Sequence, residues 1–264
     1  MPCCHVYLYP FVDKFLAEVL GTIRSSIYQN YIVPKCTKFI RYPCFLSMQG
    51  LTNLETLRLS FLLVPDIRCI WKGLVLSKLT TLNVVECKRL THVFTRSMIV
   101  SLVPLKVLKI LSCEEFNRII AKDDDENDQI LLGDHLQSLC FPNLCEIEIR
   151  ECNKLKSLFP LAMASGLPNL QILRVTKASQ LLGVFGQDDH ASPVNVEKEM
   201  VLPNLKKLSL EQLSSIVCFS FGCCDFLFPR LEKLKVYECS KLTIKFAITP
   251  NGGSMSAQSE VLLI

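Results

Sequence analysis

The 264-residue sequence lacks the motifs that most often identify an enzyme. It has no G-x-S-x-G nucleophile turn, no H-E-x-x-H zinc motif and no G-x-x-x-x-G-K-[S/T] phosphate loop, because no Gly is followed by Lys. The four histidines are scattered, so no cysteine–histidine pair with a third orienting group can be assembled. We therefore expect neither catalysis nor a bound cofactor.

Signs of secretion are also few. No Lys or Arg precedes the first apolar stretch, which Asp13, Lys14 and Glu18 interrupt, so the N-terminal segment is a poor signal peptide. None of the asparagines lies in an N-x-S/T glycosylation sequon. The 14 cysteines are therefore better explained as reduced, buried thiols of a cytoplasmic protein than as a disulfide framework.

Binding to nucleic acid or insertion into a membrane is not indicated either. The net charge is only +4, and no basic cluster is visible. The longest apolar stretch, residues 212–229, is long enough to span a membrane. However, Leu213 and Ile216 within it are in phase with the repeat described below, so we expect no membrane span.

Two groups of possible metal ligands are also incomplete. The series Asp123, Asp125 and Asn127 resembles the start of a calcium loop, but Asp128 stands where the sharp turn requires glycine. The cluster of Cys218, Cys223 and Cys224 contains no C-x-x-C pair. We expect no metal site at either place.

What the sequence does contain is an internal repeat. Seven segments share a leucine, an apolar residue three positions later and another two positions beyond that. Neighbouring segments are mostly 25 or 26 residues apart, and two longer spacings coincide with polar insertions near 122–135 and 186–199. The first leucines of the segments are Leu54, Leu79, Leu105, Leu144, Leu170, Leu205 and Leu231. A period that survives two insertions predicts a solenoid.

Each unit is expected to begin with a short strand whose alternate side chains face the core, as Leu108 and Ile110 do in the third unit. Three positions beyond the second of these, four units place a cysteine where only a small side chain fits: Cys87, Cys113, Cys152 and Cys239. The sequence thus predicts an α/β leucine-rich-repeat solenoid, or horseshoe. It would have a parallel concave sheet of about seven short strands and an irregular or short-helical convex side, with helical turns near 94–102 and 159–167.

The chain ends are expected to differ from the repeats, which cover 49–247. Apolar side chains at helical spacing between Val12 and Ile27 predict an N-terminal helix within 1–48. This helix is either a cap or remnant that covers the first repeat, or the opening of a coiled-coil segment. Residues 248–264 are rich in Gly and Ser and are expected to be disordered.

Two units, FPNLCEIEIRECNKLKSLF from Phe141 and LPNLQILRVTKASQLLGVF from Leu167, resemble the leucine-rich repeats of plant nucleotide-binding disease-resistance proteins of the coiled-coil subclass. The stretch FNRIIAKDDDEND from Phe116 is similar to that family too. The resemblance implies intracellular immune surveillance, in which repeats bind a pathogen effector or a guarded host protein and restrain a nucleotide-binding switch. The missing phosphate loop departs from the family, so the partner could also be a separate nucleotide-binding resistance protein.

Two other functions compete with this interpretation. Repeats of this length also occur in substrate adaptors of ubiquitin ligases, although residues 1–50 lack the early Leu-Pro pair of an F-box-like segment. A truncated, non-signalling decoy is the third interpretation, because the nucleotide switch is absent.

Any binding site should lie on the outward-facing strand positions of the concave side. Across these positions basic residues outnumber acidic ones, which is also typical of a solvated face. Arg174, Lys235 and Tyr237 are the expected energetic anchors, because Arg and Tyr dominate interface hot spots. The predicted protein-binding residues are Arg58, Asn83, Lys109, Glu148, Arg150, Arg174, Lys207, Glu211, Lys235 and Tyr237.

Overall fold

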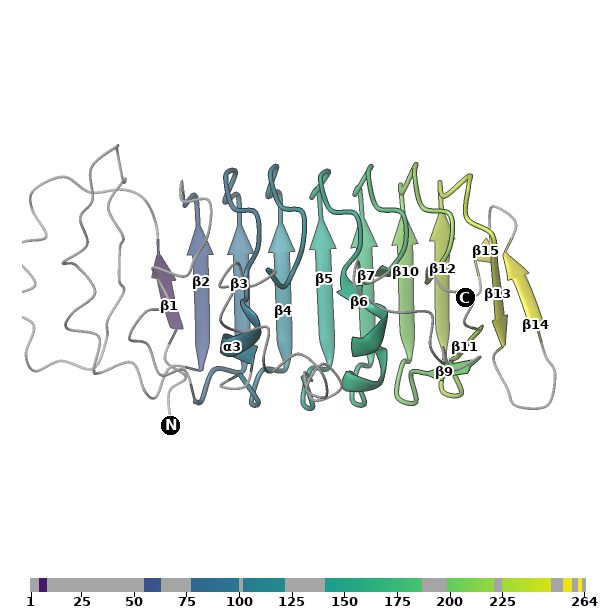
Figure 1. The fold of residues 1–264 in the computed structure, drawn as a ribbon, viewed down its shortest axis with the longest axis horizontal. Coiled ribbons are helices and arrows are strands. Elements are labelled where there is room, and N and C mark those ends of the chain that lie inside the picture. Colours follow the sequence, from purple (N-terminus) through teal and green to yellow (C-terminus); the bar gives the residue numbers. More distant parts are fainter. Residues whose placement is uncertain are drawn as a thin grey trace, which may run out of the picture.

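Seven short parallel strands form one sheet in the computed structural model (Figure 1). The structure describes residues 5–8, 55–62, 77–99, 102–121, 141–186, 199–220, 225–247, 254–257 and 261–262. The repeat strands are β2 (Thr56–Ser60), β3 (Thr81–Val85), β4 (Val107–Leu111), β5 (Glu146–Arg150), β7 (Ile172–Thr176), β10 (Lys207–Glu211) and β12 (Lys233–Tyr237). They lie side by side in chain order, as a solenoid requires.

The register between these strands has no slip. Residues at the same place in successive units pair directly, as Leu82 does with Leu108 and Leu108 with Ile147. Each anchor leucine therefore stands two residues before its strand in every coil, and Leu79, Leu105, Leu144, Leu170 and Leu205 are all buried. This equivalence confirms the predicted repeat and its inward-facing positions.

The turn that follows each strand has the same unusual backbone in all seven units. The first residue after the strand has a positive φ between 52° and 57°, although none of the seven is glycine. That conformation costs about 1–2 kcal/mol for an L-residue. In six units it points the backbone N–H at the last strand carbonyl of the next coil, as from Glu86 to Leu111 at 2.8 Å and from Gln212 to Tyr237 at 2.8 Å.

The next position is the predicted cysteine, and it is buried in all four units. Each thiol donates to the carbonyl at the end of its own strand, at 3.5 Å for Cys87, Cys113 and Cys152 and 3.4 Å for Cys239. Hydrogen bonding to Cys152, together with burial, raises the pKa of Cys113 to about 12. Hydrogen bonding to Cys113 and burial likewise raise the pKa of Cys87. Stacked coils thus bring three thiols into one column.

The side of the coils opposite the sheet is built from short, varied pieces. These are α3 (Arg96–Ile99), the 3-10 helix η4 (Leu161–Gly166), and the small strands β6 (Phe159–Pro160) and β8 (Phe185–Gly186), which pair with each other. Within the described ranges, helix is confined to these two turns, so the expected α/β class is better stated as a parallel β-solenoid. The two turns lie where the sequence places them.

A line of phenylalanines fills the interior beneath these pieces. Phe94 and Phe141 have ring centroids 5.6 Å apart, and the series continues through Phe159 and Phe185 to Phe219. All five rings are buried. Adjacent aromatic rings at these separations add attraction to the hydrophobic term, so the line joins successive coils from the second unit to the sixth.

A ladder of side-chain hydrogen bonds also joins the coils, just before the strands begin. In three units the asparagine of a Pro-Asn pair donates to a carbonyl of the preceding coil: Asn143 to Val103 at 3.0 Å, Asn169 to Pro142 at 2.7 Å and Asn204 to Pro168 at 2.8 Å. The seventh unit has Arg230 instead, and its guanidinium donates to the side-chain oxygen of Asn204 at 2.8 Å. The ladder therefore survives the substitution.

Near the C-terminus the chain departs from the sequence-based expectation. A second sheet contains β9 (Glu199–Val201), β11 (Asp225–Leu227), β13 (Ile244–Ala247) and β14 (Ser254–Ala257), and β15 (Val261–Leu262) pairs antiparallel with β12. Segments 254–257 and 261–262 were expected to be disordered, and that expectation is wrong for them. The last coil leaves the backbone groups of its strands unpaired, and the returning chain satisfies part of them.

Four residues of the N-terminal segment are described. Strand β1 (His5–Leu8) pairs in parallel with β2, so the sheet extends beyond the first repeat strand into a segment that was expected to form a helical cap or remnant. The predicted helix between Val12 and Ile27 lies outside the described residues, as do the whole insertion at 122–135 and all but the end residues of the insertion at 186–199. The domain boundaries at 48 and 247 stay predictions.

The close approach of two coils at Gly186 gives a stability prediction. A Cβ at this position would lie 2.5 Å from Oγ and 2.8 Å from Cβ of Ser157 in the preceding coil. We expect Gly186→Ala to lower the free energy of unfolding by about 1–3 kcal/mol, measured by urea denaturation. Ser157→Gly removes both contacted atoms and should recover most of the loss in the double variant. Equal destabilisation of the single and double variants would contradict this steric explanation.

The buried thiols give a second prediction. Cys87, Cys113 and Cys152 are buried, and hydrogen bonding and burial raise the pKa of Cys113 to about 12, whereas Cys145 and Cys218 are partly exposed. At pH 8 we expect iodoacetamide to modify the three buried thiols at least about 100-fold more slowly than Cys145, because they react only after the coils open. Peptide mapping by mass spectrometry distinguishes the sites, and equal rates would show that the column is open to solvent.

Candidate protein-binding face

The side chains that point away from the core form one continuous surface, which we call the open face. Positions one, three and five of each strand supply it, and the register aligns them into three rows across the sheet. The first row is Thr56, Thr81, Val107, Glu146, Ile172, Lys207 and Lys233; the second is Arg58, Asn83, Lys109, Glu148, Arg174, Ser209 and Lys235; the third is Ser60, Val85, Leu111, Arg150, Thr176, Glu211 and Tyr237.

The centre of the open face is an ion-pair network. Lys109 Nζ lies 3.1 Å from Glu146 Oε1 and 3.0 Å from Glu148 Oε2, and Arg174 Nη1 lies 3.0 Å from the same Glu146 oxygen. Burial by itself lowers the pKa of Lys109, but its two carboxylate partners outweigh that effect, and the pKa rises. The four charges cancel one another across β4, β5 and β7.

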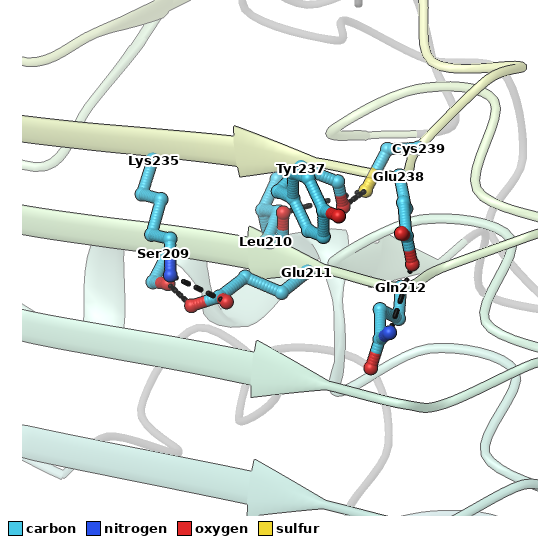
Figure 2. Close-up of polar contacts among 8 residues, drawn as sticks. All are labelled: Ser209, Leu210, Glu211, Gln212, Lys235, Tyr237, Glu238 and Cys239. Atoms are coloured by element: carbon cyan, nitrogen blue, oxygen red, sulfur yellow. Dashed lines mark hydrogen bonds and ion pairs between the residues drawn. The ribbon is translucent and has the colours of Figure 1, made fainter. Parts of the chain in front are cut away.

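A second, smaller network lies at the C-terminal end of the sheet (Figure 2). Lys235 Nζ is 2.6 Å from Glu211 Oε2, and the Ser209 hydroxyl donates to Glu211 Oε1 at 2.6 Å. Burial by itself raises the pKa of Glu211, but the hydrogen bonds from Lys235 and Ser209 prevail, and the pKa falls below 4.5. This network is also neutral overall.

Tyr237 ends the third row beside this network and is 40% exposed. A hydrogen bond from Tyr237, with a second from Gln212 at 2.8 Å, lowers the pKa of Glu238. Figure 2 shows Tyr237 at the end of β12, next to Glu238. Its partly exposed ring is of a type that often contributes strongly to protein interfaces.

The predicted site residues therefore fall into three groups. Lys109, Glu148 and Arg174 are brought together in the central network, and Glu211, Lys235 and Tyr237 in the C-terminal one. Arg58, Asn83, Arg150 and Lys207 lie on the open face but outside both networks. Of these, Arg58 donates through Nε to the Ser60 hydroxyl at 3.3 Å.

Sequence reasoning missed part of the third row. Val85, Leu111 and Thr176 are half-buried on the open face but were not assigned to it. The period of two along each strand could have found them. Together with the half-buried Val107 and Ile172 of the first row, Val85 and Leu111 make part of the open face apolar.

Two further observations concern other classes of site. In the described ranges, no group of three or more His, Cys, Asp and Glu side chains is placed to hold a metal ion. No helix in that part of the chain is long and apolar enough to cross a membrane. Leu213 and Ile216, in the stretch considered above as a span, are core residues.

Comparison with known proteins identifies the repeat. The family described as plant disease resistance protein RPS2-like, leucine-rich repeats, matches residues 124–253. These residues belong to the leucine-rich repeats of plant disease resistance proteins. The strands β2, β3 and β4 precede the matched segment but share its register, so the structural repeat itself runs from Thr56 to Tyr237.

Two curated relatives agree with this assignment. The chain is 33% identical over 117 residues to the probable disease resistance protein At5g63020 of Arabidopsis thaliana, covering 42% of this chain and 12% of that protein. It is 33% identical over 108 residues to the probable disease resistance protein At4g14610 of the same plant, covering 40% of this chain and 14% of the relative. The chain thus spans a small part of these relatives. No solved structure matches it significantly.

The Lys235–Glu211 pair gives a prediction about pH. Because the pKa of Glu211 is depressed in the folded state, the pair stabilises the protein above the ordinary Glu pKa of 4.5, and this contribution is lost as the pH falls through the lower, folded-state value. At pH 7, Lys235→Met should lower the free energy of unfolding by no more than about 1 kcal/mol, because Lys235 is half exposed.

The matched control for this prediction is Lys207→Met, the same change in the neighbouring strand. We expect the stability deficit of Lys235→Met to shrink as the pH falls through the folded-state pKa of Glu211, because the carboxylate that Lys235 pairs with then becomes protonated. The Lys207→Met protein should show no such pH-dependent deficit. Denaturation curves at several pH values measure both, and a deficit that stays constant with pH would contradict the assigned pair.

Proposed function

We propose that the solenoid is a non-enzymatic recognition module of plant intracellular immunity that binds a protein ligand on its open face. The ligand is a pathogen effector, a guarded host protein or a separate nucleotide-binding resistance protein. In this proposal the open face is the concave side of a horseshoe, and the protein acts in the cytoplasm. The observation that carries the proposal is the match of residues 124–253 to the repeats of plant disease resistance proteins.

The chemistry of the open face supports a protein ligand. Its two ordered polar networks hold long side chains in fixed positions, and half-buried apolar residues lie between them. Exposed Tyr237 and Arg174 belong to the residue types that contribute most to protein interfaces. Seven strands at about 4.8 Å spacing give a surface roughly 29 Å across, which suits a protein rather than a small molecule.

The proposal is tested by proximity labelling in plant cells with the full chain fused to a biotin ligase. We expect a resistance protein, or a protein that such receptors monitor, among the enriched partners. The double variant Arg174→Ala/Tyr237→Ala should lower enrichment of that partner by about tenfold or more, since each hot spot contributes about 2 kcal/mol. If the variant and the wild type enriched the partner equally, binding on the open face would be contradicted.

A matched control is Lys156→Ala/Leu182→Ala. Both residues are exposed and lie on adjacent coils away from the sheet, where the Leu182 amide donates to the Lys156 carbonyl at 3.0 Å. This variant should retain the partner. Recovery of cullin and other ligase components would instead favour the substrate-adaptor function, and recovery of no partner by wild type or variants would favour the decoy.

A further inference from the structure

The remaining charges on the open face are uneven. Its three carboxylates, Glu146, Glu148 and Glu211, all hold cations of the same face. Lys207 and Lys233 form no ion pair with a carboxylate within the described part of the chain. They are direct register partners on β10 and β12, so two positive charges lie opposite each other. Like charges opposite each other on adjacent strands are destabilising. Folding alone therefore gives no reason for this pair.

The surroundings of the pair strengthen its positive potential. Lys206 precedes Lys207 at the start of β10, and its half-exposed side chain adds a third cation nearby. Among the described residues, the acidic Glu232 lies opposite Lys206 where the two strands begin, and its backbone N–H donates to the Lys206 carbonyl at 2.8 Å. Two carboxylates of the open face lie around the pair: Glu146, on the same row two strands away, is held by Lys109 and Arg174, and Glu211, at the other end of β10, is held by Lys235 and Ser209.

We propose that Lys207 and Lys233 form the docking point for an acidic segment of the protein ligand, with Asp or Glu side chains in extended backbone. This rests on the proposed function and specifies its ligand. Each partner carboxylate would separate two repelling ammonium groups, so binding relieves a repulsion as well as forming ion pairs. Ile172 on the same row and Tyr237 at the far end of β12 supply apolar contact beside the charges.

A protein segment explains these observations better than nucleic acid does. Non-specific nucleic-acid binding needs a track of cations that follows the phosphate backbone, and affinity grows with the number of phosphates neutralised. Here Lys207 and Lys233 lie next to each other, whereas Arg150 stands apart on β5 and the ion pairs of the central network occupy the rows between, so no continuous track of cations crosses the described sheet. A short acidic stretch flanked by apolar residues matches that distribution.

The test measures binding of the full chain to a fluorescein-labelled octaglutamate peptide by fluorescence anisotropy. Wild type should bind it, and the affinity should fall as NaCl rises from about 50 to about 300 mM. Lys207→Gln/Lys233→Gln should weaken binding by about fivefold or more, because two exposed ion pairs are lost. An octaglutamine peptide should not bind to either protein.

The control is Lys156→Gln/Lys241→Gln, which removes two exposed positive charges away from the open face. It should bind octaglutamate as wild type does, and both variants should keep the wild-type melting temperature to within a few degrees. Equal weakening by the two double variants, or no binding by wild type, would overturn the proposal. So would tighter binding of single-stranded DNA than of octaglutamate through the same two lysines.

The outcome is separable from that of the proposed function. If octaglutamate fails to bind but Arg174→Ala/Tyr237→Ala still loses a partner in cells, the open face binds protein without using an acidic segment. If octaglutamate binds through Lys207 and Lys233 but labelling recovers no partner, the pair is a cationic site without the proposed immune role.

Discussion

The lateral hydrogen bonding of one coil to the next determines the rest of this structure. Every repeat strand pairs without slip with its neighbours, and six residues in the left-handed region extend that pairing into the turn. A single coil would leave these backbone groups and one face of its core unpaired, so no unit is stable alone. The positive φ at positions such as Glu86 and Ser112 is strained by itself, and it persists because the next coil accepts the bond.

Because the register is fixed, a side chain that packs or hydrogen-bonds well at one position can make the same contact at the equivalent position of the next coil. The thiol column, the asparagine ladder and the phenylalanine line are three results of this rule. Where the residue changes, the contact is kept by other means: Arg230 continues the ladder through Asn204, and Ala178 and Leu213 fill the cysteine position with buried carbon. The interior thus restricts the residue types along each coil, whereas the open face is restricted mainly by solubility and binding.

This division explains what could be predicted from the sequence. The strands, the inward-facing leucines and the buried cysteines follow from a local pattern repeated every 26 or so residues, and the structure confirms them. The ion pairs do not follow from it. Lys109 and Glu146 lie on either side of the first insertion in the sequence, so their spacing does not predict that they meet. Glu146 forms ion pairs with both Lys109 and Arg174 because β4, β5 and β7 are neighbours in the sheet. Strands β14 and β15 were missed because their pairing depends on the last coil rather than on their own composition.

The sequence also could not indicate which cations remain available to a partner. Counting charges on the predicted face gives a mildly basic surface with Arg174 and Lys235 as anchors, yet both already hold carboxylates. A partner therefore contacts Arg174 and Lys235 with their ion pairs in place, because displacing those carboxylates would leave Glu146 or Glu211 with fewer counter-charges. The Lys207–Lys233 pair has the opposite balance, because any added carboxylate lowers a repulsion that the fold sustains. In the proposed interaction, selectivity therefore depends less on the total charge of the face than on which charges the fold has left uncompensated.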